Sequence, residues 1–110
     1  MTERSRKYLS DILIAAGLIE DFLSDVPDFS VYQGDQKTKS AVERQLVIVG
    51  EAVNLFKKEC GLELHNSTQI VNFRNRLVHA YDSIDDAIVW VIIQKYLPDL
   101  KKEVEKLLNN

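Results

Sequence analysis

Apolar residues in the first part of the chain recur at intervals of three and four, the periodicity of an α-helix. This pattern predicts a first helix from about Glu3 to Ser24. Its main stripe consists of Tyr8, Ile12, Ala15, Ile19, Phe22 and Val26, and the stripe is widened beyond one face by Leu9, Leu13, Ile14 and Leu18. Pro27 then breaks the helix, because proline disfavours helical backbone at the preceding residue.

A second helix is predicted from about Lys37 to Glu59, again with more than one apolar face. Its main stripe is Val42, Leu46, Val49, Val53 and Phe56, and further apolar positions are Val47, Ile48, Ala52 and Leu55. Gly50 lies inside this helix and costs about 1 kcal/mol relative to alanine. We therefore expect another helix to approach closely at Gly50, and we expect Gly61 to end the helix.

The remaining sequence predicts two more helices. The third covers about Thr68 to His79, with Ser67 or Asn66 as its N-cap. After the break "YDSID", the fourth is capped by Ser83 or Asp85 and runs to about Leu108. Pro98 falls within its apolar stripe and removes one backbone hydrogen bond, so a kink or short break is expected near Gln94 to Leu97 with the axis roughly continuing.

Four amphipathic helices with short connections predict an all-α fold, an antiparallel four-helix bundle formed as one domain by residues 1–110. The apolar faces are wider than one small bundle can bury. This excess predicts a two-fold homodimer.

Composition narrows the choice of function. The net charge of -3 argues against a general nucleic-acid coat protein, but it leaves room for a small local basic site. Cys60 is the single cysteine and cannot form an internal disulfide. No signal-type segment is recognisable, and the longest apolar run is far shorter than the roughly 20 residues that span a bilayer. We therefore expect a cytoplasmic protein with no membrane segment.

The segment "NFRNRLVHAY", residues 72–81, carries the candidate chemistry. On a helix, Arg74 falls in the apolar face, whereas Asn75 and His79 lie together on nearly the opposite side. Arg74 and His79 diverge by about 140°. They converge only if the helix ends or distorts near His79, or if a second chain completes the site. An arginine in an apolar stripe needs a partner, and phosphate or carboxylate suits its guanidinium.

Simpler interpretations stand beside this one. An isolated R-x-x-x-x-H spacing arises often by chance, and a histidine is favoured at a helix C-terminus by the macrodipole. Arg76 is either a phosphate contact or a solvated charge, and Glu51 is either a partner of an arginine or a surface carboxylate. His65 is expected on the surface, and no residue spacing suggests a metal or another cofactor.

The match is longer than this pair of residues. The stretch "RNRLVHAY" resembles the R-x-x-x-x-H-x-Y signature of the HEPN superfamily, specifically the HepT toxins of HepT–MntA toxin–antitoxin modules. The segments "RKYLSDILIAAGLIEDFL", "TKSAVERQLVIVGEAVNLF" and "DDAIVWVIIQKYLPDLKKEVEKLL" are also similar to that family. The resemblance covers nearly all 110 residues.

This resemblance implies a metal-independent endoribonuclease whose cleft forms at a two-fold dimer interface. Arg74 and His79 would be catalytic, with Asn75, Arg76 and Tyr81 in supporting roles. It also implies a partner, a minimal nucleotidyltransferase antitoxin that transfers AMP to Tyr81. The alternative is a non-catalytic HEPN module that binds, and is modified by, such a partner. A purely structural dimeric bundle would leave the motif unexplained.

Overall fold

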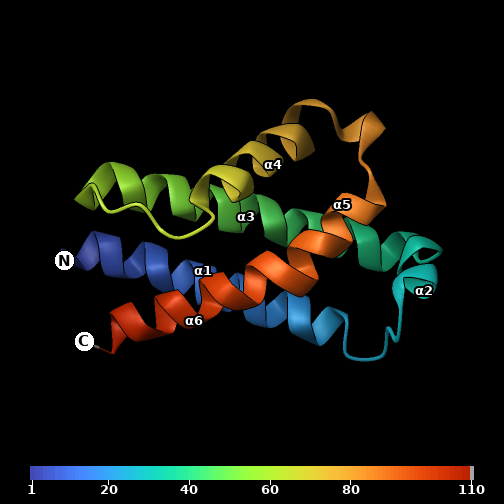
Figure 1. Ribbon diagram of the computed structural model, residues 1–110, viewed down its shortest axis with the longest axis horizontal. Helices are drawn as coiled ribbons and strands as arrows, with labels where there is room; N and C mark the ends of the chain where they lie inside the picture. Colours follow the sequence, from blue (N-terminus) through green and yellow to red (C-terminus); the bar gives the residue numbers. More distant parts are fainter. Residues whose placement is uncertain (110) are drawn as a thin grey trace.

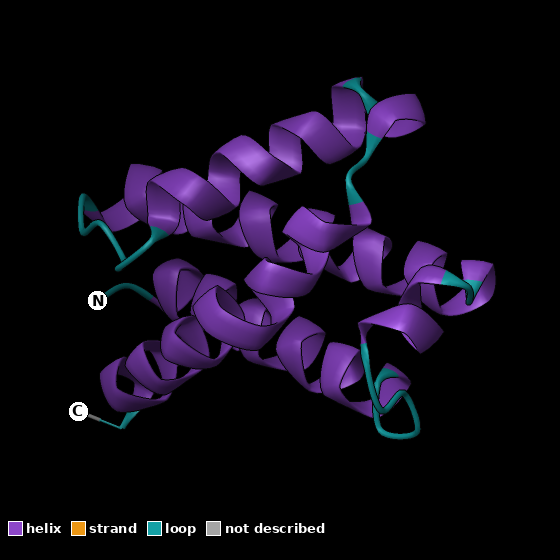
Figure 2. Cartoon of the chain, turned by 45° about the vertical axis from the view of Figure 1, so that its right-hand side comes forward, coloured by secondary structure: helices purple, strands orange, loops and turns teal. Residues whose placement is uncertain are grey.

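The computed structural model describes residues 1–109, apart from the side chain of Tyr81, and contains no strand within them. The long helices are α1 (Glu3–Phe22), α3 (Gln36–Cys60), α4 (Ser67–His79) and α6 (Leu97–Leu108). The shorter elements are α2 (Phe29–Gln33), the 3₁₀ turn η1 (Tyr81–Ser83), α5 (Asp86–Val91) and the π-helical segment η2 (Ile92–Tyr96). Helices joined by short loops account for nearly all of the chain (Figure 2). The predicted all-α fold is confirmed.

The long helices alternate in direction (Figure 1). α1 and α4 run one way, and α3 and the α5–α6 segment run back, so the antiparallel four-helix bundle is confirmed. α1 packs between α3 and α6, whereas α4 packs mainly against α3. Within the described residues, no helix is long and apolar enough to cross a membrane.

Side chains at the helix ends explain most of the boundaries. Thr2 accepts a hydrogen bond from the backbone N–H of Ser5 and caps α1, and Asp35 does the same for Thr38 at the start of α3. Gly61 ends α3 as predicted, with a left-handed φ of 76° that glycine adopts without strain.

One of the two residues predicted as the N-cap of α4 does occupy that position, but the expected capping by a side chain is wrong. Asn66 occupies the N-cap position, but its side chain makes no capping bond and its φ is 64°. Ser67 is already helical, and its hydroxyl donates to the Glu63 carboxylate at 3.2 Å. The Ser67 hydroxyl, which was expected to cap α4, therefore bonds instead to Glu63, a residue that precedes the helix.

The helix before Pro98 contains a π-helical turn instead of a simple kink. Leu97 donates its N–H to the carbonyl of Ile92, five residues back, and this widened turn is the π-helical segment η2. Proline cannot donate the hydrogen bond that the regular ladder needs at this point, so the preceding turn is rearranged. The irregularity lies where it was predicted, and α5 continues through it into α6 (Figure 1).

Helix α2 was not predicted. It lies in the segment that was expected only to break the chain after Pro27, and Asp28 caps it by accepting from Val31. Its aromatic residues hold it in place, because Trp90 of α5 lies 6.0 Å from Phe29 and 5.2 Å from Tyr32 between ring centres. α2 therefore anchors α5 at one end of the bundle.

Candidate functional site

The candidate motif lies on α4, a helix that is packed against the rest of the bundle. Ile70, Phe73 and Leu77 are buried, and their side of α4 faces α3. The helix remains regular through His79 and ends where Ala80 adopts a φ of -136°. The backbone N–H of Ala80 donates to the Arg76 carbonyl at 2.8 Å. The motif arginine and histidine are thus both presented by one continuous helix.

Arg74 lies directly against Gly50, where α4 packs closely on α3. A Cβ atom placed on Gly50 would come 2.4 Å from the Cβ of Arg74 and 2.8 Å from its Cγ. No side chain fits in that space, so only glycine allows the two helices to approach this far. The close approach predicted at Gly50 is confirmed, and the residue on the opposite side is the motif arginine.

The guanidinium of Arg74 has a donor, its Nε atom, that is buried and finds no hydrogen-bond partner among the described residues. Leaving a buried donor without an acceptor costs about 1–3 kcal/mol. Among the same residues, no ion pair joins Glu51 to an arginine, and Glu51 is exposed. The arginine is therefore fixed by packing at its stem and ready to donate hydrogen bonds at its head.

His79, Asn75 and Arg76 are exposed. His79 and Arg76 lie in the last turn of α4, where positive charge is favoured by the helix dipole. Because α4 is regular between Arg74 and His79, these two side chains leave the helix about 140° apart. The helix does not distort to bring them together within one chain.

Tyr81 opens the turn η1, immediately after α4 has ended. Its side chain lies outside the described part of the structure, so its position relative to His79 is not assigned. The expected chain break at "YDSID" is in fact partly helical, and Asp85 caps α5 by accepting from the N–H of Ala87 at 2.9 Å.

A half-buried charged cluster at the start of α5 was missed by the sequence analysis. Lys39 forms an ion pair with Asp86 at 2.9 Å, and their side chains are 15% and 18% exposed. Burial, followed by the nearby charge of Asp86, raises the pKa of the Glu43 carboxyl above its usual value. Burial also raises the pKa of the fully buried Tyr32 hydroxyl. This cluster holds α5 against α3 and lies outside the motif.

A second feature lies on the outer side of α1 and α3. The exposed Ile14 and Leu18 of α1 were predicted to widen its apolar face. Val47, Ile48 and Leu55 of α3 line a hollow of about 300 Å³ between the two helices. The charged Asp11, Arg44 and Glu51 are also part of its lining. Leu9 and Ala52, by contrast, were also assigned to the wider faces and are buried in the core. The surface of the bundle therefore retains an apolar face.

Within residues 1–109, no three His, Cys, Asp or Glu side chains gather closely enough to hold a metal ion. Cys60 is a free and exposed thiol.

Known proteins resemble this chain over nearly its whole length. The family model described as "Ribonuclease HepT-like" matches residues 12–107. The "Probable ribonuclease HepT" of Thermococcus cleftensis is 37% identical, over 96% of this chain and 97% of that protein. A Methanocaldococcus jannaschii protein named "Putative RNase MJ1380" is 33% identical, over 96% and 98% of the two chains. No solved structure matches significantly.

Proposed function

This chain belongs to the ribonuclease HepT-like family, and on that basis we propose that it is a metal-independent endoribonuclease that acts on cytoplasmic RNA as the toxin of a toxin–antitoxin module. One observation carries the proposal. The motif arginine is fixed against Gly50 and retains a buried N–H without a partner, on the same helix that presents an exposed histidine at its end.

The chemistry follows from the RNA itself. The ribose 2′-OH attacks the adjacent phosphorus, the bond to the 5′-oxygen of the next nucleotide breaks, and the products are a 2′,3′-cyclic phosphate and a 5′-hydroxyl. His79 takes the proton from the 2′-OH or gives one to the leaving oxygen, since imidazole changes charge near neutral pH. Arg74 stabilises the negative oxygens of the phosphorane. Asn75 orients the imidazole or binds a phosphate oxygen.

A homodimer is part of the proposal. Because Arg74 and His79 point apart on a regular helix, a two-fold pair of chains offers a way to build one cleft from both motifs. The apolar face with Ile14 and Leu18 on α1 and Ile48 on α3 supplies a surface for such a contact. Light scattering at micromolar concentration should therefore give the mass of a dimer, and a stable monomer would remove the composite cleft.

The catalytic proposal is tested by RNA cleavage. His79→Ala and Arg74→Ala should each lower the cleavage rate at least about a hundredfold while the far-ultraviolet circular dichroism stays unchanged. His65→Ala is the matched control, because His65 is exposed on the loop before α4 and should leave the rate unchanged. Cleavage should persist in EDTA. Folded His79→Ala protein that cuts RNA at the wild-type rate would refute the role of the histidine.

We further propose that a cognate minimal nucleotidyltransferase silences the ribonuclease by transferring AMP from ATP to the Tyr81 hydroxyl, with pyrophosphate as the leaving group. The phosphodiester adds about one negative charge, which can pair with Arg74 or Arg76 and take the place of RNA phosphate. After incubation with the partner, ATP and magnesium, peptide mapping should find AMP on Tyr81, while Tyr81→Phe stays unmodified and keeps the cleavage rate that it had before the incubation. Wild-type protein that accepts AMP but never cuts RNA would instead identify a non-catalytic module.

A further inference from the structure

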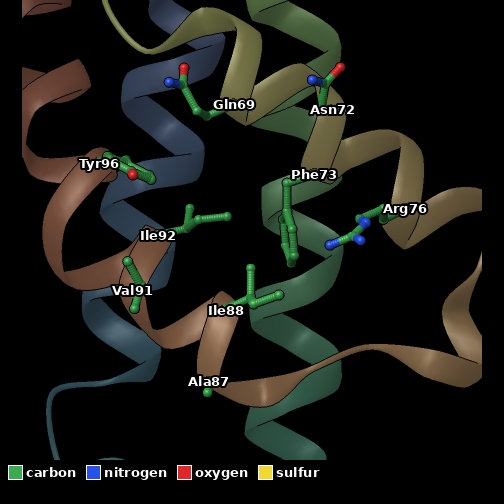
Figure 3. A pocket seen from close by; sticks show the side chains of 9 residues that line it. All are labelled: Gln69, Asn72, Phe73, Arg76, Ala87, Ile88, Val91, Ile92 and Tyr96. Carbon is green, nitrogen blue, oxygen red and sulfur yellow. The ribbon is translucent and has the colours of Figure 1, made fainter.

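A groove of about 610 Å³ runs between α4 and α5, beside the motif (Figure 3). Gln69, Asn72, Phe73 and Arg76 line it from α4, all on one side of that helix. Aliphatic side chains of α5 and the aromatic ring of Tyr96 line the opposite wall. Its volume is within the range of about 300–1,000 Å³ that is typical of sites for small ligands.

The groove exists because its two walls are held by different neighbours. α4 rests mainly on α3, whereas α5 is held by α2 and by the Lys39–Asp86 ion pair. Ile88 and Val91 of α5 consequently remain 37% and 47% exposed. The π-helical segment contributes too, since Ile92 and Tyr96, its first and last residues, both line the groove. Such segments are frequent at functional sites.

From this geometry we infer that the groove binds a nucleobase of the RNA strand, next to the phosphodiester bond that is cut; the inference rests on the proposed ribonuclease function. The lining combines the groups that hold an unpaired base. The half-buried ring of Tyr96 offers aromatic surface for stacking, and the edge of the mostly buried Phe73 and aliphatic side chains form an apolar floor. Gln69 and Asn72 bring carboxamides, which both donate and accept hydrogen bonds at a base edge.

The charge of the groove matches the same ligand. Arg76 extends its guanidinium toward the groove from α4 (Figure 3). Lys95 does not line the groove, but its ammonium lies 5.6 Å from the centre of the ring of Tyr96, which does. The described lining contains no Asp or Glu, although the whole chain carries a net charge of -3. A phosphate beside the bound base can therefore pair with Arg76 and meets no carboxylate within the groove lining. A carboxylate, that of Asp85, lines the adjoining hollow, which shares Arg76 and Ile88 with the groove.

The groove is continuous with the candidate catalytic residue along α4. Asn72, Arg76 and His79 are spaced by four and three residues, so they form one stripe on the surface of the helix. Asn72 and His79 are about 10 Å apart along the axis, at 1.5 Å per residue. A strand whose phosphate lies at His79 can thus place a neighbouring base in the groove. The groove shares no lining residue with the hollow between α1 and α3.

The test uses full-length protein and two probes. The first is a short single-stranded 2′-O-methyl RNA with one unmodified ribonucleotide, because only that position keeps the attacking 2′-OH and so fixes the register. The second is the same strand fully 2′-O-methylated, which can bind but cannot be cut. Each probe is made with an abasic residue at one position in turn around the cut. Cleavage rate is measured with the first probe and affinity, by fluorescence anisotropy, with the second.

Val91→Trp fills the groove from an exposed position, and Leu62→Trp is its matched control, since Leu62 is 45% exposed and does not line the groove. We expect Val91→Trp to weaken both affinity and cleavage about tenfold, the effect of losing one stacked base. Removing the base at one position beside the cut should weaken the wild type by a similar factor and should not weaken Val91→Trp further. The Gln69→Ala/Asn72→Ala double variant should change which base is preferred there, whereas Gln94→Ala should not.

Several results would overturn the inference. Base removal that slows cleavage equally in the wild type and in Val91→Trp would show that the base binds elsewhere. Unchanged RNA binding by Val91→Trp, with loss of a protein partner or of the dimer, would make the groove a protein contact. If the wild type does not cut RNA at all, the proposed function fails. The affinities for the uncleavable strand still test whether the groove binds a base, because equal affinities of the wild type and Val91→Trp would refute base binding there.

Discussion

The two sides of α4 are built in opposite ways. On the side toward α3, Gly50 lets the backbones approach until the stem of Arg74 fills all the space between them. On the side toward α5, aliphatic and aromatic side chains face one another across a groove of about 610 Å³. One helix thus has a closed side, which carries the motif arginine, and an open side, which continues along the surface to His79.

The difference shows how a small bundle can combine a fixed charge with an accessible surface. Packing at Gly50 restricts the stem of Arg74, so little side-chain entropy remains to be lost when its head binds a ligand. The open side is possible because α5 is fastened to α2 and α3 instead of α4. The contact that fixes Arg74 and the contacts that keep the groove open are therefore different, so each can be changed by its own substitution.

The largest effect is expected at the closed side. Gly50→Ala should lower the free energy of unfolding by about 1–3 kcal/mol, because the added Cβ meets the Cβ of Arg74 and α4 must shift. RNA cleavage should fall as well, even below the melting temperature, because Arg74 moves with α4. Thermal and urea unfolding measure the first effect, and cleavage of a fixed RNA measures the second.

Gly17→Ala is the matched control for that substitution. Gly17 also lies inside a long helix, but a Cβ placed there has no atom within 4 Å. Alanine should therefore stabilise the protein by up to about 1 kcal/mol through helix propensity alone. If both variants are stabilised equally, the Gly50 contact does not restrict α4 and the closed side is not rigid.

A smaller effect is expected where α5 is fastened. Lys39→Met removes the partner of a half-buried carboxylate, Asp86, which also lies near Glu43. It should cost about 1 kcal/mol, more than exposed pairs do and less than fully buried ones. Lys7→Met breaks the exposed Lys7–Asp11 pair and should not measurably change stability. Equal unfolding midpoints for the two variants would show that the Lys39–Asp86 pair does not hold α5.

The smallest effect is a dependence on pH. The pKa of the Glu43 carboxyl in the folded protein is raised above its ordinary value of 4.5, mainly by burial, so folding favours the protonated form. The contribution of Glu43 to the free energy of unfolding is most favourable below pH 4.5 and is lost as the pH rises through the pKa of the folded state. Glu43→Gln should therefore raise stability at pH 7 by less than about 1 kcal/mol, since solvent screens the half-buried group. The gain should vanish near pH 4 in urea unfolding, and a gain that persists there would point to packing instead of charge.

The helices themselves were predictable because local features specify them. Apolar spacing located the four long helical regions, and Gly61 and Pro98 marked an end and an irregularity through backbone geometry that holds in any context. Gly50 also revealed a close helix contact in advance. The short helix α2 escaped prediction because it is stabilised by Trp90, more than 50 residues away in the sequence, and not by its own periodicity.

The sequence by itself determined the helical bundle, the motif and the divergence of Arg74 from His79, because all three follow from residue order and the pitch of a helix. Only the tertiary structure decided that Arg74 faces Gly50 with its Nε unpaired, and that α4 and α5 separate to leave a groove. Both depend on which helices become neighbours. That choice is made by packing among residues distant in sequence, where the shapes of both partners decide how closely two helices can approach.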